Sequence, residues 1–281
     1  MGTSARNDLP STFRSHPTPA YAVSLVAAVL MAAMCAIGLL WSASVYPADE
    51  FRKAFVPNDA AGLVIGLPVL LGSMLLARRG RLIGLLLWPG ALLFILYNYL
   101  VYAFCMPWNA AYLAYLALIL TSAAALVLLA RAVDFGAVRE RLAGAVPNRL
   151  CGGILAALGA LYLLLAAGSI LRAVIAGPLM TDTALAVSLA DLAVSPVWIA
   201  GGVLLWLRKP AGYAAGLGLM FSLTMLFVGL LFIFILEPFL AGTAFRWADS
   251  LVILVMSLVI VVPMGMYIRG VVRKNGMTGS S

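Results

Sequence analysis

Charged side chains are scarce in this sequence of 281 residues. Only 10% of the residues are Asp, Glu, Lys or Arg, whereas 64% are apolar. A soluble domain typically carries about 25% charged residues. Because a water-soluble fold of this length has no place to hide so much apolar surface, the composition predicts an all-α protein that crosses a membrane several times.

Histidine and lysine are nearly absent. The single histidine is His16, and the three lysines, Lys53, Lys209 and Lys274, all lie in expected loops or in the C-terminal tail. Bis-histidine haem, zinc hydrolase and diiron sites each need several histidines within the membrane. A retinal Schiff base needs a lysine inside a helix. The sequence excludes all four kinds of site.

Cysteine is also rare, and the usual cofactor motifs are missing. Cys35, Cys105 and Cys151 lie in or beside apolar segments without a CxxC pair, so we interpret them as small buried residues rather than as a disulfide framework. The chain has no GxSxG, HExxH, Walker or dinucleotide-binding motif, and no DDxxD cluster for diphosphates. We therefore expect neither a cofactor nor a metal site.

The charges that are present are mostly basic, with 18 Lys and Arg against 10 Asp and Glu. In a soluble protein such an excess would suggest a nucleic acid partner. Here the basic residues stand in short segments between apolar stretches, and membrane proteins concentrate Lys and Arg in their cytoplasmic loops. We therefore expect no nucleic acid partner.

Eight apolar stretches are each long enough to cross a hydrocarbon core of about 30 Å at about 1.5 Å per residue. The first is much longer than the apolar core of a signal peptide, about 7–15 residues, which predicts a membrane anchor. Pro68 lies inside the second stretch and is expected to bend or unwind it. The stretches cover residues 20–46, 60–77, 82–105, 108–133, 150–175, 183–207, 211–236 and 247–268.

The basic residues also predict the orientation. If the N-terminus is inside and the spans alternate, fourteen of the 18 basic residues fall on the inner side. The outer side receives only Arg52, Lys53, Arg172 and Arg246. We therefore expect a multi-pass protein of the cell (cytoplasmic or inner) membrane with both termini in the cytoplasm.

The domain organisation follows from these spans. We expect a disordered cytoplasmic tail over 1–19, a first four-helix half over 20–133, a linker over 134–147, a second half over 148–269 and a C-terminal tail over 270–281. Pro68, Arg78 and Arg79 recur at nearly the same spacing as Pro196, Arg208 and Lys209. This pattern indicates two parallel repeats related by an axis along the membrane normal, although apolar helices also resemble one another by chance.

Two loops carry patterns typical of short helices at a membrane surface. The outer loop 47–59 has Phe51 and Phe55 four residues apart. The inner loop 134–147 has an apolar helical face opposite two arginines. The apolar residues are Phe135, Val138 and Leu142, and the arginines are Arg139 and Arg141. Plain connectors are the alternative in both places.

Two glycines spaced by four residues indicate that one helix packs closely against another. Gly212 and Gly216 form a small-xxx-small pattern, which lets helix backbones approach each other. Packing within one chain is the favoured interpretation. The face of a homodimer is the alternative.

Polar side chains within the spans gather in the outer half of the expected bundle. Burying such groups in lipid costs about 2.5–3.5 kcal/mol for a charged residue on insertion scales, so their presence needs a reason. Within each helix they are spaced by three or four residues, which places them on one face. The candidate ligand-binding residues are Asn98, Tyr102, Asn109, Tyr112, Arg172, Asp191, Trp198 and Glu237.

Asp191 is the most informative of these residues. Its side chain is too short to reach the membrane surface from two turns below the outer end of its helix. We expect it to point into the bundle and to meet Arg172, a tyrosine hydroxyl or water. A structural ion pair with Arg172 and a functional cavity are both open interpretations.

Three functions fit this pattern. The first is binding or transport of a small lipophilic or amphipathic molecule through a polar and aromatic cavity in the outer leaflet half, with membrane lipids as further partners. The second is a metal-independent intramembrane enzyme for an isoprenoid- or lipid-like substrate, with Asp191 or Glu237 as the general acid and a tyrosine as its partner. The third is a structural subunit of a membrane complex.

Overall fold

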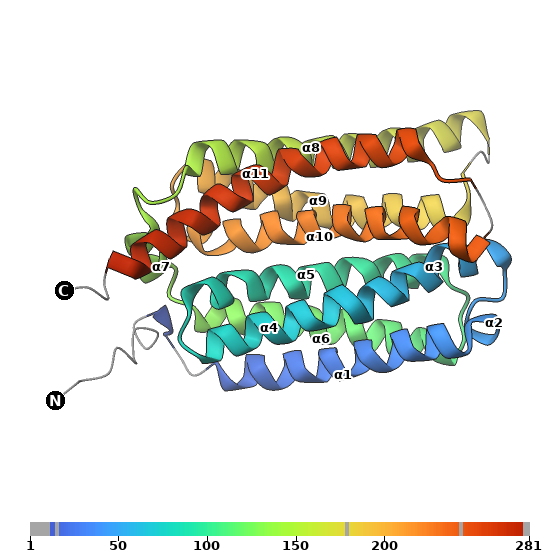
Figure 1. Cartoon of the computed structure of the whole chain (residues 1–281), viewed down its shortest axis with the longest axis horizontal. Coiled ribbons are helices and arrows are strands. Elements are labelled where there is room, and N and C mark those ends of the chain that lie inside the picture. Colours follow the sequence, from blue (N-terminus) through green and yellow to red (C-terminus); the bar gives the residue numbers. More distant parts are fainter. Residues whose placement is uncertain (1–11, 15–16, 178–179, 242–243, 278–281) are drawn as a thin grey trace.

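The chain forms a bundle of long helices in the computed structural model, which describes residues 12–14, 17–177, 180–241 and 244–277. Within this part of the chain, eight helices are long and apolar enough to cross a membrane (Figure 1). The prediction of an all-α, multi-pass membrane protein is confirmed. The spans are α1 (Thr18–Leu40), a composite second span (Asp49–Arg78), α5 (Leu82–Cys105), α6 (Ala110–Ala132), α8 (Asn148–Ala176), α9 (Asp182–Trp206), α10 (Pro210–Ala241) and α11 (Trp247–Met277).

The second span differs from the prediction. It consists of α3 (Asp49–Ala61), the π-helical segment η2 (Gly62–Gly66) and α4 (Leu67–Arg78), which follow one another without a break. The surface helix predicted for the loop 47–59 is instead the first part of this span. The reason is that Phe55 is buried, with its ring centroid 4.5 Å from that of Tyr102. The aromatic face that suggested a membrane surface instead packs against the protein.

The proline of this span has the expected effect. Pro68 stands in the first turn of α4, directly after η2, where the N–H of Leu67 bonds to the carbonyl of Gly62 five residues earlier. Proline lacks the N–H that a regular helix needs at this point, and its ring crowds the preceding turn. The wider π-helical turns accommodate both effects.

The linker between the halves contains a short amphipathic helix, as predicted. The helix α7 (Phe135–Leu142) buries Val138 and Leu142 completely and exposes Arg139. Asp134 caps its N-terminus by accepting hydrogen bonds from the N–H groups of Gly136 and Ala137. The buried face packs against α10 and α11, so the helix is anchored on the bundle.

Part of the expected disordered tail has a defined position. Phe13 and Val133 form an antiparallel bridge, and Arg14 N–H bonds to the carbonyl of Ala132. Arg14 also forms an ion pair with Asp134. Residues 270–277 of the expected C-terminal tail belong to α11, and residues 1–11, 15–16 and 278–281 of the expected tails lie outside the described residues.

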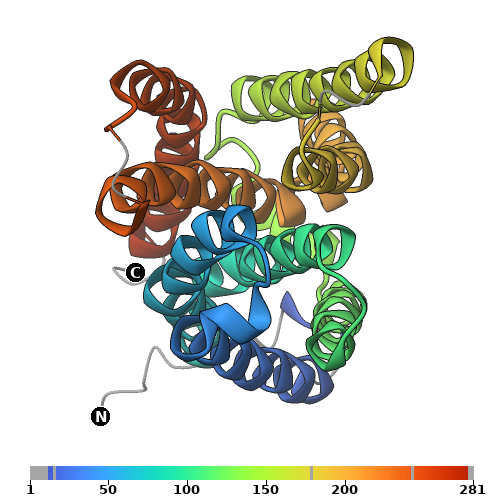
Figure 2. The ribbon, with the colours of Figure 1, turned by 90° about the vertical axis from the view of Figure 1, so that its right-hand side faces the viewer.

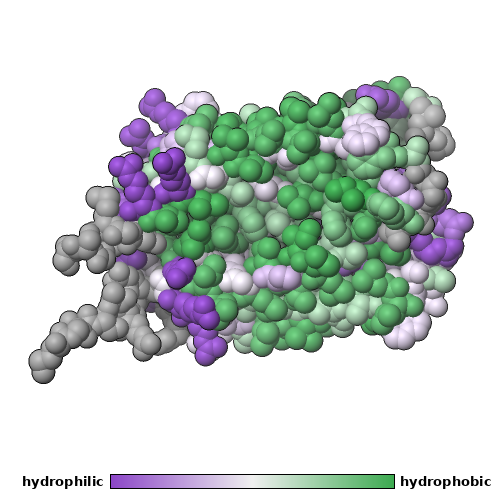
Figure 3. Space-filling model, viewed as in Figure 1, coloured by the Kyte–Doolittle hydropathy of each residue, from purple (hydrophilic) through white to green (hydrophobic). Residues whose placement is uncertain are grey.

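The helices form two groups that follow the chain order. Viewed along the bundle, α1, the second span, α5 and α6 lie on one side, and α8 to α11 lie on the other (Figure 2). Both termini and α7 lie at one end, here called the proximal end, and the opposite end is called the distal end (Figure 1). A broad apolar band covers the visible face between the two more polar ends (Figure 3).

The turn between α4 and α5 has the same local structure as the turn between α9 and α10. Gly80 and Arg208, at equivalent positions, both have positive φ angles, of 80° and 58°. Five backbone hydrogen bonds also recur in the same order, with lengths of 2.9 to 3.4 Å in the first turn and 2.9 to 3.3 Å in the second. Their donors are Arg79, Gly80, Arg81, Gly84 and Leu85 in the first turn and Leu207, Arg208, Lys209, Gly212 and Tyr213 in the second. The two helix pairs therefore share one local structure in the same orientation, as the repeat hypothesis requires.

Two equivalent glycines meet at the centre of the bundle. Gly90 of α5 and Gly218 of α10 correspond when the two turns are aligned, and a Cβ atom on Gly90 would overlap the backbone of Gly218. A Cβ atom on Gly218 would lie 2.8 Å from the carbonyl oxygen of Leu86. The two halves thus contact each other backbone to backbone at residues that are equivalent in this alignment.

The small-xxx-small pattern of α10 serves packing within the chain. A Cβ atom on Gly212 would overlap the backbone of Leu205 in α9, and one on Gly216 would lie 2.8 Å from the Leu205 side chain. The interpretation as intrachain packing is confirmed for this pair.

Replacing Gly90 by alanine should destabilise the protein. The added methyl group meets backbone, which cannot rotate away, and overpacking of this kind typically costs about 1–3 kcal/mol or more. Thermal unfolding in detergent measures the effect. Gly229→Ala on α10, where a Cβ atom meets nothing within 4 Å, is the matched control. An equal change in both variants would contradict the backbone contact.

Acidification should loosen the start of α7. The backbone N–H of Ala137 and the nearby Arg14 hold the pKa of Asp134 below its usual value. A lowered pKa means that the cap stabilises the fold above the ordinary carboxyl range and is lost as the pH falls through the lowered pKa. Hydrogen-exchange protection of Gly136 and Ala137 should therefore fall on acidification. The protection should be low and independent of pH in Asp134→Ala; a pH response retained in that variant would refute the assignment.

Candidate functional site

A buried carboxyl group stands at the centre of a hydrogen-bonded group in the first half. Asp59 of α3 is only 2% exposed. The Tyr46 hydroxyl donates to its Oδ2 at 2.6 Å, and the Tyr102 hydroxyl donates to its Oδ1 at 2.7 Å. Asn58 Nδ2 in turn donates to the Tyr102 oxygen at 3.2 Å. Both carboxyl oxygens thus have a phenol donor, and the bonds continue to a neutral amide.

The neighbouring elements leave room for this group. A Cβ atom on Gly38 of α1 would overlap Asp59 Oδ2 and lie 2.7 Å from the Tyr46 hydroxyl. Tyr46 follows the short helix α2 (Ser42–Val45), which brings the chain back over the distal end of the half. Glycine on one helix and a return loop on the other side therefore create the space that the carboxyl and the phenol share.

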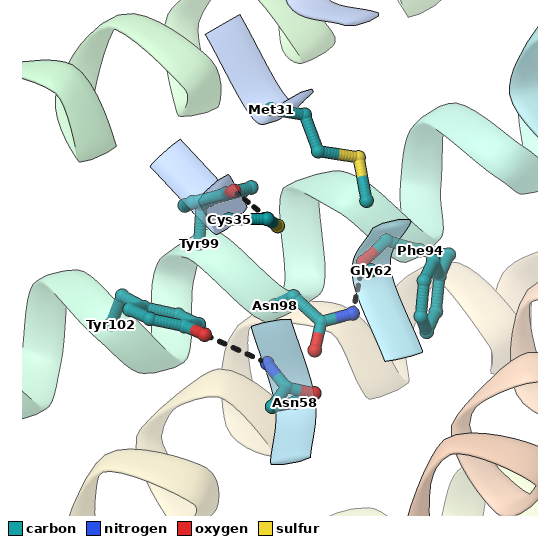
Figure 4. Close-up of a pocket in the computed structure, with 8 residues that line it drawn as sticks. All are labelled: Met31, Cys35, Asn58, Gly62, Phe94, Asn98, Tyr99 and Tyr102. Atoms are coloured by element: carbon teal, nitrogen blue, oxygen red, sulfur yellow. Dashed lines mark hydrogen bonds between the residues drawn. The ribbon is translucent and has the colours of Figure 1, made fainter. Parts of the chain in front are cut away.

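A small pocket lies beside this group, between α1, the second span and α5 (Figure 4). Its free space holds about one water molecule. Asn98 Nδ2 donates to the Phe94 carbonyl at 2.9 Å, and Cys35 Sγ lies 3.7 Å from the Tyr99 hydroxyl. The lining residues are Met31, Cys35, Asn58, Gly62, Phe94, Asn98, Tyr99 and Tyr102.

The pocket includes part of the predicted site and several residues that the sequence did not reveal. Asn98 and Tyr102 line it, as expected for a site in the half of the bundle away from the termini. Asn58 and Asp59 were assigned to a loop because the second apolar stretch begins at residue 60. The spacing of Phe55, Asp59 and Gly62 by four and three residues was the available signal, since it continues one helical face into the span.

A second buried carboxyl group joins the two halves. Asp191 of α9 is 8% exposed, and the Tyr97 hydroxyl of α5 donates to its Oδ1 at 2.8 Å. Trp198 is fully buried and donates from Nε1 to Ser222 Oγ of α10 at 3.1 Å. Its ring centroid lies 5.9 Å from that of Tyr162 on α8. Asp191 and Trp198 thus belong to a polar and aromatic cluster around α9.

The expected ion pair between Arg172 and Asp191 is not formed. Arg172 is exposed on α8. The ion pairs among the described residues are Arg14 with Asp134, Arg52 with Asp49 and Arg246 with Asp249. Asp191 instead accepts a hydrogen bond from the hydroxyl of Tyr97 on the neighbouring helix α5. A tyrosine hydroxyl was the second partner that the sequence predicted for it.

The other predicted site residues lie elsewhere. Asn109 caps α6 by accepting a hydrogen bond from Tyr112 N–H at 3.2 Å. The Tyr112 ring stacks on the largely exposed Trp108, with centroids 4.6 Å apart. Glu237 is half-buried near the end of α10, one residue before Pro238. None of these side chains lines the pocket of Figure 4.

The second half shows that the fold does not require the polar pocket. In the alignment that pairs Gly90 of α5 with Gly218 of α10, Asn98, Tyr99 and Tyr102 correspond to Leu226, Phe227 and Leu230. Both are regular helices over these residues. Apolar side chains therefore satisfy the packing at the equivalent positions, and the polar ones in the first half need a separate explanation.

The chain was compared with protein families, curated proteins and solved structures. No protein-family model, curated protein or solved structure matches the chain.

Removing the Asp59 carboxyl should destabilise the protein. Asp59→Ala leaves two buried tyrosine hydroxyls without an acceptor, at a cost of about 1–3 kcal/mol for each. Asp59→Asn keeps one carbonyl acceptor and should lose less. The free energy of unfolding in mixed micelles measures both.

Glu140→Ala is the control for this series, because Glu140 is an exposed carboxylate on α7. It should leave the free energy of unfolding nearly unchanged. If Asp59→Ala is as stable as this control, the two tyrosines do not depend on Asp59.

Proposed function

We propose that this integral membrane protein binds or transports a small amphipathic molecule, and that the polar head group of the molecule occupies the pocket between α1, the second span and α5. The observation that carries the proposal is a hydrogen-bonding pocket at the π-helical segment, for which the second half has only apolar counterparts on α10. Polar groups inside a membrane commonly mark a substrate pathway. Single π-helical turns also occur frequently at functional sites.

The chemistry of the pocket favours a neutral head group. Its polar lining consists of two amides, two phenols and a thiol. Asp59 lies behind this lining, and both of its oxygens already accept hydrogen bonds from tyrosines. The amides and phenols of the lining both donate and accept hydrogen bonds. A hydroxyl or a primary amide on the ligand does the same and therefore matches them. A charged head group would find no counter-ion in the lining.

The size of the pocket limits what it holds in this conformation. Ligand sites usually measure about 300–1,000 Å³, far more than space for one water molecule. A hydroxyl fits this space, whereas a primary amide head group and the apolar part of the ligand require the side chains of Met31 and Phe94 to move. Methionine has three rotatable side-chain bonds, which makes such a movement inexpensive.

The distribution of basic residues predicts which half of the membrane contains the pocket. Both termini lie at the proximal end (Figure 1). If the excess of Lys and Arg places this end in the cytoplasm, the pocket lies in the outer half of the membrane. Ligands would then enter from the outer leaflet.

Acid–base catalysis has less support. Asp191 and Glu237 lie on different helices, α9 and α10, and share neither a hydrogen bond nor a common partner among the described residues. Their arrangement gives no specific reason to assign them to one reaction. No specific observation favours the third alternative, a structural subunit of a membrane complex.

Thermal shifts with probes of equal tail length test the proposal. Octanol and octanamide should raise the unfolding temperature of the purified protein, whereas octanoate and octylamine should do so much less. Gly62→Ala should abolish the difference, because its Cβ atom would lie 2.8 Å from Cys35 Sγ and 3.3 Å from Met31 Cε and fill the pocket.

The control is Gly72→Ala in the same span, where a Cβ atom meets nothing within 4 Å. This variant should respond to the probes as the parent does. Asn98→Leu, which copies the residue at the equivalent position of α10, should lose the response. Equal shifts for the neutral and charged probes, or a full response in Gly62→Ala, would refute the proposed pocket.

A further inference from the structure

The two halves are linked by side-chain hydrogen bonds on the distal side of their glycine contact. Within the described residues these bonds are Tyr97 to Asp191 at 2.8 Å, Thr183 to Glu50 at 3.1 Å and the long contact of Cys105 Sγ with Thr183 Oγ1 at 4.0 Å. All of them join α9 to the first half. We call this row of contacts the seam.

Asp191 is the buried carboxyl group of the seam, with 8% of its surface exposed. Its Oδ1 accepts the Tyr97 bond, and its Oδ2 has no hydrogen-bond partner among the described residues. One turn further along α9, the hydroxyl of Ser195 is fully buried and is likewise unpartnered in the described structure. The seam thus contains unused hydrogen-bonding capacity next to a carboxyl group.

No basic side chain compensates for this carboxyl group in the described part of the chain. Three helices pack against α9. The titratable residue that faces Asp191 from α5 is Tyr97, and the one from α8 is Tyr162. From α10, Ser222 belongs to the same cluster and accepts the hydrogen bond from Trp198 Nε1. Arg172 on α8 is exposed and forms no ion pair with Asp191.

We propose that Asp191 is a proton-binding site, and that uptake of a proton there loosens the seam between the two halves. A proton needs only one free carboxylate oxygen, whereas Ca²⁺ or Mg²⁺ needs about six or more oxygen ligands. The ligand that matches the geometry is therefore a proton. This site is separate from the pocket near Asp59, and the proposal does not depend on the proposed ligand.

The effect on the seam follows from the strength of one hydrogen bond. A hydrogen bond from a phenol to a carboxylate is about twice as strong as one between neutral groups. Protonation of Asp191 removes this advantage and weakens the Tyr97 bond. The Gly90–Gly218 backbone contact does not involve this bond and lies on the proximal side of the seam, because Gly90 precedes Tyr97 and Cys105 in α5, so it can act as the pivot.

The thiol of Cys105 is a native reporter of the seam. It is buried at the distal end of α5, beside Thr183. In a protein carrying Cys35→Ala and Cys151→Ala, the rate at which N-ethylmaleimide labels Cys105 measures opening of the seam. Dividing this rate by that of the same protein with Asp191→Asn, at each pH, removes the titration of the thiol itself.

The expected ratio is well below one at alkaline pH and rises by about tenfold to near one on acidification, which corresponds to about 1.4 kcal/mol of seam stability. Tyr97→Phe removes the bond itself and should label at least as fast as Asp191→Asn, whose amide oxygen keeps only the weaker neutral bond. Asp59→Asn, which changes a buried carboxyl on another face of α5, should leave the pH dependence of labelling unchanged. A ratio that does not vary with pH would overturn the proposal.

Infrared difference spectroscopy provides a readout that needs no labelling. The parent protein should gain a protonated carboxyl band on acidification that is absent in Asp191→Asn and retained in Asp59→Asn. If the band persists in Asp191→Asn, the proton binds elsewhere and the assignment to Asp191 is wrong.

Discussion

A membrane interior offers no water to buried polar groups, so each of them must find a partner within the protein. Helix α5 supplies most of these partners. Its three tyrosines, Tyr97, Tyr99 and Tyr102, contact Asp191, Cys35 and Asp59, which belong to three other helices. One helix therefore holds polar groups of both halves through hydroxyls spaced along a few turns. This explains why α5 is the most thoroughly buried of the spans.

The repeat gives the two halves the same local structure but different chemistry. The turn after α4 and the turn after α9 match bond for bond, and Gly90 meets its equivalent Gly218 where α5 and α10 cross. The similarity is limited to these turns and this contact, because among the described residues only the first half contains a π-helical segment. At the pocket positions of the central helix the first half has one amide and two phenols, and the second half has leucine and phenylalanine at the equivalent positions. Since apolar residues suffice for packing, we attribute the polar ones to function.

The sequence predicted the fold well and the site partly, for physical reasons that differ. Hydropathy and span length found all eight spans, and helical spacing found the buried face of α7. The start of the second span was missed because charged residues precede Phe55, although the helix continues through them. Asp59 lies in this first part of the span and was therefore not predicted as a site residue. The partner of Asp191 depended on whether a residue on α5 or α8 comes closer, which sequence spacing within one helix does not determine.

The two buried carboxyl groups each accept a hydrogen bond from a tyrosine of α5, but they lie around different faces of that helix. Tyr97 and Tyr102 are five positions apart in the sequence, which at about 3.6 residues per turn places them about 140° apart around the helix axis. Asp59 and Asp191 therefore lie on different faces of the same helix and have no need to contact each other. Each carboxyl group thus has its own tyrosine partner on α5, and the seam and the pocket remain separate sites on that helix.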